Sequence, residues 1–199
     1  MSKKEMKTIG LTGIMGAGKS SVIAILEKHS ITVLDADKIN ANLLCKGNAG
    51  YVKLVSVFGK ELLDGDANID KTLMSTIIFQ DEQSRLLAEG ILHPLIKEEI
   101  KKEIEKHKDE KLVVVEVPLL FECKWEAFFD EVWVVACDED ILLERLKQYR
   151  KIDEKVARAR IAHQIPQCEK IKKADVVFYN NSDKENLKRQ IYDILKVNF

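Results

Sequence analysis

The chain has 199 residues, 46% of them hydrophobic and 33% charged, and its formal net charge is −1. This length suits one domain with an insertion or two small lobes, and it can bury a sizeable core. A nearly neutral chain has no bulk electrostatic attraction for nucleic acid. The N-terminus is polar and lysine-rich, and no apolar run approaches the ~18 residues of a membrane span. We therefore expect a cytoplasmic protein, a monomer or weak homo-oligomer, with neither nucleic-acid nor membrane partners.

The cysteines predict neither a disulfide framework nor a zinc site. Cys45, Cys123, Cys137 and Cys168 form no C-x-x-C pair, and none is grouped with histidines at the spacing of zinc ligands. We expect free thiols, because disulfides belong mainly to oxidising compartments.

The beginning of the chain alternates between strand and helix patterns. Residues 7–12 predict a strand that enters a glycine-rich loop, and residues 18–28 predict a helix with one apolar side. Residues 31–37 (ITVLDAD) predict a second strand, which ends in two aspartates.

Residues 38–107 differ from the sequence on either side. They contain segments of helical period but no convincing strand, and stretches rich in Gly, Asp and Asn separate these segments. We expect His93-Pro94 to break the last segment before the amphipathic stretch LIKEEIKKEIEKHK. The prediction is a helical insertion over 38–107 within a core formed by 1–37 and 108–199.

Strand and helix patterns alternate again after this insertion. The nearly continuous apolar runs KLVVVEVP and EVWVVAC suit parallel strands buried on both faces. A helix is expected over 138–150 with Asp138 as its N-cap, followed by a charged, alanine-rich segment over 151–173. A last strand over 174–181 and a closing helix over 183–197 complete the pattern. It predicts a doubly wound α/β core with a parallel sheet and helices on both faces.

The stretch LTGIMGAGKSS contains the phosphate-binding pattern G-x-x-x-x-G-K-S. Gly13, Gly16, Gly18, Lys19 and Ser20 follow a predicted strand and open a predicted helix, which is the context that a P-loop requires. Small residues let backbone N–H groups turn towards an anion, and the lysine and serine can bind phosphate and Mg²⁺. A tight turn with an incidental lysine is one alternative. A dinucleotide-binding turn is another, but its G-x-G-x-x-G pattern is absent.

A small-molecule kinase suits the rest of the chain better than other P-loop classes. A regulatory GTPase should carry an N-K-x-D guanine reader and a D-x-x-G switch, and neither pattern occurs. A larger ATP-driven machine is usually longer. A kinase needs a base, an acceptor site and a closing lid, and the sequence offers candidates for each.

The candidate base lies in LDAD, where Asp35 and Asp37 end the predicted second strand. Ligands bind at the carboxyl ends of parallel strands, and a carboxylate there can take the proton of an acceptor hydroxyl. The alternative is that both aspartates cap the following helix.

The candidate lid begins with the charged stretch DEDILLERLKQYRK. Arg158 and Arg160 follow it, and arginines on a mobile segment can bind the charge of a transferring phosphoryl group. A solvated charged helix is the alternative. The stretch VVVEVPLLFE places apolar residues after a strand, where they serve either an acceptor site or only packing.

A series of stretches carries a resemblance over nearly the whole chain. In order they are GLTGIMGAGKSSV, VLDADKI, LHPLI, EVPLLFE, ILLERL, RIAHQ and KADVVFYNN. Together they resemble the dephospho-CoA kinase family. The resemblance implies transfer of the γ-phosphoryl group of ATP to the ribose 3′-hydroxyl of dephospho-CoA, which completes coenzyme A. It also implies that residues 38–107 form a CoA-binding lobe and that about 145–170 form the lid.

The resemblance implies roles for individual residues. Asp37 is the expected base, Lys19 and Arg145 stabilise the transferring group, Ser20 holds Mg²⁺, and Asn180 lies near the adenine. The residues expected to bind ATP are Gly13, Gly16, Ala17, Gly18, Lys19, Ser20, Ser21 and Asn180. The residues expected to bind the substrate are Thr12, Asp37, His93, Pro94, Leu119, Leu120, Glu122 and Arg160.

The chain departs from the family's usual pattern in the P-loop and in the lid. Ile14 stands where the family commonly has glycine, and Ala17 where it commonly has serine. Four residues after the arginine that matches Arg145, the family usually has R-D, but this chain has Tyr149-Arg150. Arg150 is the expected replacement for the missing cation, displaced by about 100° around the helix.

Overall fold

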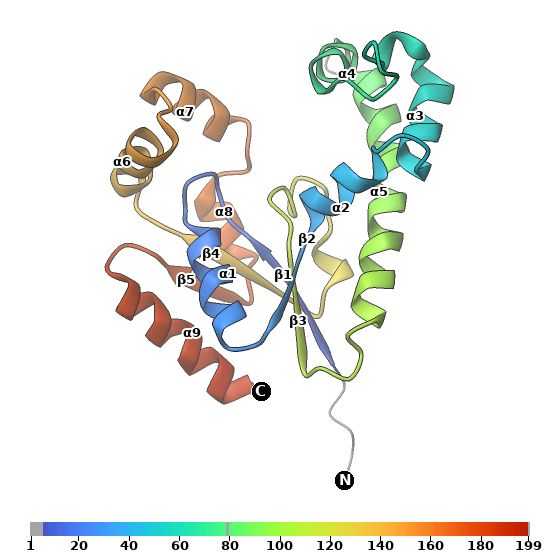
Figure 1. Cartoon of the computed structure of the whole chain (residues 1–199). Helices are drawn as coiled ribbons and strands as arrows, with labels where there is room; N and C mark the ends of the chain where they lie inside the picture. Colours follow the sequence, from blue (N-terminus) through green and yellow to red (C-terminus); the bar gives the residue numbers. More distant parts are fainter. Residues whose placement is uncertain (1–5, 79, 199) are drawn as a thin grey trace. The chain divides into compact units, whose positions relative to one another are not determined.

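The computed structural model describes residues 6–78 and 80–198, and the chain divides into two compact units. Unit 1 comprises the described residues up to Leu34 and from His107 onward, and unit 2 comprises the described residues of Asp35–Lys106. Each unit has its own hydrophobic core. Figure 1 follows the chain through both. The substrate-binding role expected of residues 38–107 stays a prediction.

Unit 1 is built on a five-stranded sheet with the strand order β2-β3-β1-β4-β5. Strand β1 pairs in parallel with β3 and β4, and β4 pairs in parallel with β5. The strands are β1 (Lys7–Thr12), β2 (Thr32–Asp35), β3 (Leu112–Glu116), β4 (Glu131–Ala136) and β5 (Val176–Tyr179). The helices are α1 (Lys19–Lys28), η2 (Glu126–Phe128), α6 (Glu139–Arg150), α7 (Glu154–Ala162), α8 (Gln167–Lys172) and α9 (Lys184–Asn198). The predicted doubly wound parallel core is confirmed.

Alternate residues of the central strand β1 pack on opposite faces of the sheet, as the period of two in a strand requires. Ile9 and Leu11 lie in the core that α1 and α9 cover, and Figure 1 shows these two helices side by side. Gly10 faces the other way, where an added Cβ would lie 2.5 Å from Leu120 and 2.6 Å from Phe129. The segment after β3 therefore packs directly on the strand that precedes the P-loop.

Unit 2 is helical. It contains α2 (Ala36–Leu43), α3 (Ala49–Phe58), η1 (Lys60–Leu62), α4 (Lys71–Ile78) and α5 (Glu82–Glu105). Its core is formed by Leu54, Leu62, Ile78 and Ala88. Over the described residues, the only extended pairing in this unit is an isolated bridge between Leu63 and Ile69, so the helical prediction is confirmed.

The predicted helix break at His93-Pro94 is wrong. Helix α5 continues through Pro94 for 24 residues in all. A proline inside a helix removes the hydrogen bond to the carbonyl four residues earlier, here that of Gly90. Burial of Ala88 before the proline and of Ile96 and Ile100 after it stabilises both halves of the helix.

The second predicted strand is shorter than expected, and its two aspartates have different surroundings. Strand β2 ends at Asp35, whose carboxylate accepts a hydrogen bond from Lys38 N at 3.0 Å and caps α2. Asp37 lies in the first turn of α2 and is exposed. The capping alternative is therefore correct for Asp35, because helix α2 starts directly at the end of the strand.

Candidate active site

The loop between β1 and α1 is shaped by glycines in conformations that other residues rarely adopt. Gly13 has a φ of 153° and Gly18 a φ of 99°. A Cβ on Gly13 would lie 2.4 Å from the carbonyl oxygen of Val135 on β4. Gly18 is the N-cap of α1 in the left-handed region. These positions accept only glycine without strain, and so the loop has the compact path that a phosphate-binding turn needs.

Lys19 lies across this loop. Its Nζ donates to the carbonyl oxygen of Gly13 at 2.9 Å, so the cation stays beside the turn. Ser20 follows on α1 and is exposed. The N-terminal end of a helix carries partial positive charge. The loop therefore offers a cation, a hydroxyl and a helix dipole at one place, which together suit a polyphosphate.

Asn180, which follows β5, also contacts the loop. Its Nδ2 donates to the carbonyl oxygen of Ala17 at 2.9 Å, and the residue is buried. A Cβ on Gly18 would lie only 2.1 Å from this Nδ2. The structure thus gives Asn180 a part in shaping the P-loop, and its expected place near the adenine stays a prediction.

Arg145 on α6 presents an unsatisfied group to the same loop. Its Nη1 lies 3.9 Å from the position of a Cβ on Gly18. Within the described part of the chain, this nitrogen is buried and has no hydrogen-bond partner. Burial raises the pKa of the neighbouring Cys137 thiol, and the positive charge of Arg145 partly opposes that rise. A buried guanidinium N–H without an acceptor is costly, and an anion at the P-loop would satisfy it.

The other arginines of the expected lid differ in their partners. On α7, Arg158 donates to Glu154 at 2.9 Å and also pairs with Glu139 of α6, and these hydrogen bonds raise its pKa. Arg160 and Arg150 lie exposed. Arg158 is therefore engaged within the protein, and the exposed arginines are the better candidates for phosphate contacts.

The residues expected on the acceptor side of unit 1 have partners within the protein. Thr12 is fully buried and its hydroxyl donates to the carbonyl oxygen of Pro118 at 3.2 Å. Leu119 is 45% exposed, whereas Leu120 is fully buried. Glu122 Oε1 accepts from Ile165 N at 2.9 Å and lies 2.8 Å from Lys170 Nζ. Their contacts with a substrate stay predictions.

Three predicted residues belong to unit 2. Asp37 lies on α2, and His93 and Pro94 lie on α5. Burial lowers the pKa of His93, with Glu89 opposing this effect and Lys97 adding to it. Their roles also stay predictions.

The sequence reasoning missed the segment that follows α7. Gln164 accepts a hydrogen bond from the P-loop nitrogen of Met15 at 3.0 Å, and the side chain of Lys170 is fully buried. Gln164 is the last residue of RIAHQ, one of the stretches that carry the family resemblance, but the sequence offered no reason to assign it a role. Nothing distinguished Lys170 from the many exposed lysines around it.

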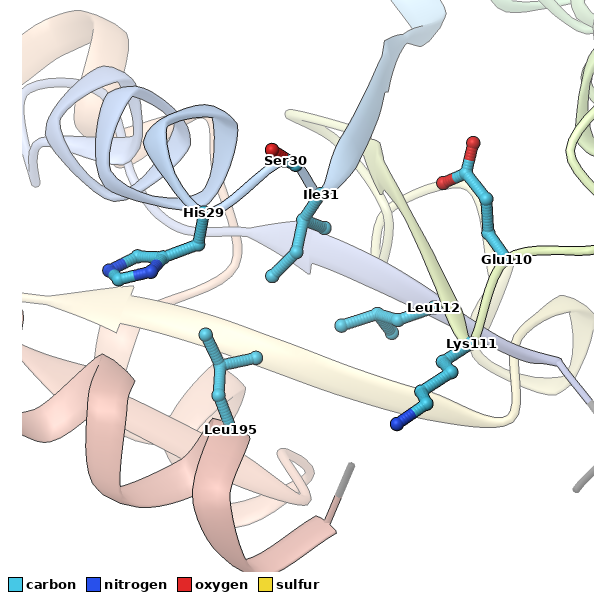
Figure 2. Close-up of a pocket in the computed structure, with 7 residues that line it drawn as sticks. All are labelled: His29, Ser30, Ile31, Glu110, Lys111, Leu112 and Leu195. Carbon is cyan, nitrogen blue, oxygen red and sulfur yellow. The ribbon is translucent and has the colours of Figure 1, made fainter.

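A pocket of about 380 Å³ lies elsewhere in unit 1. Figure 2 shows its lining by His29, Ser30, Ile31, Glu110, Lys111, Leu112 and Leu195. These residues adjoin the beginnings of β2 and β3, whereas ligands of parallel sheets bind at the carboxyl ends of the strands. The P-loop edge is therefore the candidate active site.

Comparison with known proteins assigns this site to a family. The family model described as dephospho-CoA kinase matches residues 7–186. The chain belongs to the dephospho-CoA kinase family. A dephospho-CoA kinase of Geobacillus kaustophilus is 38% identical over 191 residues, which cover 95% of each chain. One of Bacillus anthracis is 40% identical over 190 residues, covering 94% of this chain and 95% of the relative.

Solved structures agree with this family. A dephospho-CoA kinase of Campylobacter jejuni superposes with a TM-score of 0.70 at 28% identity, covering 95% of each chain. A shikimate kinase of Bacteroides thetaiotaomicron has a TM-score of 0.51 at 15% identity, covering 96% of this chain and 98% of its own, which shows likeness of fold alone. In the described parts of this chain, no helix combines the length and apolar character needed to cross a membrane.

Proposed function

We propose that the chain transfers the γ-phosphoryl group of ATP to the 3′-hydroxyl of the ribose of dephospho-CoA, with ADP and coenzyme A as products. Membership of the dephospho-CoA kinase family, an enzyme family of the final step of coenzyme A biosynthesis, supports the reaction. The buried, unpartnered Nη1 of Arg145 beside Gly18 carries the proposal, because it fits an anion held by the P-loop.

Charge on the transferring group is stabilised from unit 1. Lys19, the amides of the loop and Arg145 supply positive charge and hydrogen-bond donors that are in place before the reaction. The exposed hydroxyl of Ser20 suits a Mg²⁺ ligand. Mg²⁺ held there would supply positive charge that offsets the negative charge of the phosphates. Exposed Arg160 adds a further cation in the lid.

The acceptor is activated by a carboxylate. Asp37 accepts the proton of the 3′-hydroxyl, and its exposure on α2 leaves it accessible to a substrate. Binding of dephospho-CoA involves the apolar pair Leu119 and Leu120 together with Thr12, His93, Pro94 and Glu122. The expected monomer or weak homo-oligomer, the cytoplasmic location and the absence of nucleic-acid partners remain predictions.

The test is the release of ADP from Mg-ATP in the presence of dephospho-CoA, with the product identified by mass. ATP alone, and ATP with adenosine or AMP as acceptor, are the controls. Release that depends on dephospho-CoA is the expected result. Tight binding of ATP without any acceptor-dependent turnover would contradict the proposal.

A further inference from the structure

Gln164 connects the end of α7 to the P-loop. Its backbone N donates to the carbonyl oxygen of Ile161 in the last turn of α7 at 2.9 Å. Its side-chain Oε1 accepts from the backbone N of Met15 at 3.0 Å. Through these two hydrogen bonds, Gln164 links the last turn of α7 to a backbone amide of the P-loop.

The other end of the α6–α7 segment also contacts the P-loop, at the next residue. The position of a Cβ on Gly16 lies 3.0 Å from Leu146 and 3.2 Å from Leu142, both on α6. Helices α6 and α7 lie side by side in Figure 1, and the ion pair of Arg158 with Glu139 links them. Met15 and Gly16 are thus held from both ends of one helical segment.

The chain that follows Gln164 is attached to the core. Ile165 N donates to Glu122 Oε1 at 2.9 Å, and the fully buried Lys170 lies 2.8 Å from the same oxygen. Gln167 both accepts from Cys137 N at 3.1 Å and donates to its carbonyl oxygen at 2.9 Å. Gln164 therefore lies at the boundary between the α6–α7 segment and a part of the chain fixed to the sheet.

We propose that Gln164 is a positioning residue for phosphoryl transfer: it orients the P-loop through Met15 N and couples that loop to the α6–α7 segment. The role of Gln164 in phosphoryl transfer rests on the proposed function. The link between the P-loop and the α6–α7 segment does not. If Met15 N loses its acceptor, the turn can change conformation. The backbone amides that follow Met15 can then point in other directions. Phosphate-binding geometry tolerates little displacement, so rate and nucleotide binding depend on this hydrogen bond.

Gln164→Met tests the proposal, because methionine has a similar length but offers no strong acceptor. Gln190→Met on α9 is the matched control. Gln190 likewise accepts a backbone hydrogen bond, from Tyr179 N at 2.9 Å, and it also donates to the carbonyl oxygen of Tyr179 at 2.9 Å. Both variants lose a glutamine that binds backbone, and only one of these glutamines contacts the P-loop.

We expect Gln164→Met to lower kcat/KM for ATP about tenfold and to change KM for dephospho-CoA by less than about twofold. Gln190→Met should change the kinetic constants by less than about twofold while lowering Tm at least as much. Equal kinetic losses in both variants, or none in Gln164→Met, would overturn the proposal.

Hydrogen exchange of residues 13–18 supplies a measurement that needs neither substrate nor turnover. Exchange should be at least about tenfold faster in Gln164→Met than in the parent, and unchanged in Gln190→Met. Unchanged exchange in Gln164→Met would refute the coupling even if the enzyme were active. Faster exchange in a chain that lacks acceptor-dependent turnover would refute the proposed reaction and leave the coupling standing.

Discussion

The loops after β1 and β3 lie at the same edge of the sheet but are held in different ways. The loop after β1 takes its path first from local causes, its own glycines and the bond of Lys19 to Gly13, six residues apart, and distant Gln164 and Asn180 add one hydrogen bond each. The loop after β3 is held by distant residues: Thr12 bonds to Pro118 across 106 positions, and Ile165 to Glu122 across 43. Changes in the first loop should therefore affect chemistry most, and changes beneath the second should affect stability most.

Lys19→Ala should give the largest effect on activity. It removes the cation beside the P-loop, so kcat/KM should fall roughly 10³-fold while the fold persists. Steady-state kinetics and nucleotide titration measure the loss. Lys28→Ala, at the other end of α1, is the control and should behave like the parent. An unaffected Lys19→Ala variant would contradict the P-loop assignment.

Lys170→Met tests the long-range attachment of the second loop. It leaves the carboxylate of Glu122 largely buried without its cation, which should lower the free energy of unfolding by about 3–5 kcal/mol. Denaturant unfolding measures this. The double variant Glu122→Gln/Lys170→Met should recover most of the loss, because the side-chain amide introduced by Glu122→Gln is uncharged and its oxygen can still accept from Ile165 N. If Lys170→Met were as stable as the parent, the ion pair would not contribute to the free energy of unfolding.

Asp37→Asn separates the base from the nucleotide site. We expect turnover to fall about 10²-fold or more, because the amide cannot take the proton, while ATP affinity stays near normal. Asp66→Asn, an exposed change in the same unit, is the control. Full turnover by Asp37→Asn would remove this residue from the mechanism.

Arg150→Ala and Tyr149→Ala compare adjacent positions at the end of α6. Tyr149 is 80% exposed and Arg150 is exposed as well, so neither change should harm the fold. If Arg150 replaces the family's usual lid arginine, its loss should lower kcat about tenfold, against less than about twofold for Tyr149→Ala. The opposite order would assign the role to Tyr149.

His93→Gln should have the smallest effect, visible as a pH dependence. Burial lowers the pKa of His93, so the unfolded chain binds a proton more readily than the folded chain. The free energy of unfolding should therefore decrease as the pH falls below about 6.5, and His93→Gln should make this slope shallower. Urea unfolding between about pH 8 and pH 5.5 measures it, with the exposed His163→Gln as control. An identical slope in parent and His93→Gln would contradict the lowered pKa of His93 as a cause of this pH dependence.

Much of the architecture could be predicted because its causes lie close together in the chain. The strand β1, the turn at Gly13 and the start of α1 at Gly18 depend on neighbouring residues and on backbone conformations that only certain residues adopt. Buried parallel strands such as β3 and β4 are recognised by their continuous apolar runs. The order of these elements then predicted the parallel sheet.

Other features depended on contacts between distant residues. The continuation of α5 through Pro94 reflects burial on both sides of the proline, which outweighs one lost hydrogen bond. The different positions of Asp35 and Asp37 reflect where α2 begins, and a short motif does not specify that point. The predicted roles of the site residues, Asp37 among them, remain untested.

The amino-acid order alone determined the glycine loop, the alternation of strands and helices and the likeness to the dephospho-CoA kinase family, since each is encoded in local pattern. Tertiary structure decided that Gln164 bonds to Met15, that Glu122 pairs with a buried lysine and that Arg145 retains an unpartnered nitrogen beside the loop. Side chains of these types occur throughout any chain, and only burial and proximity after folding distinguish them.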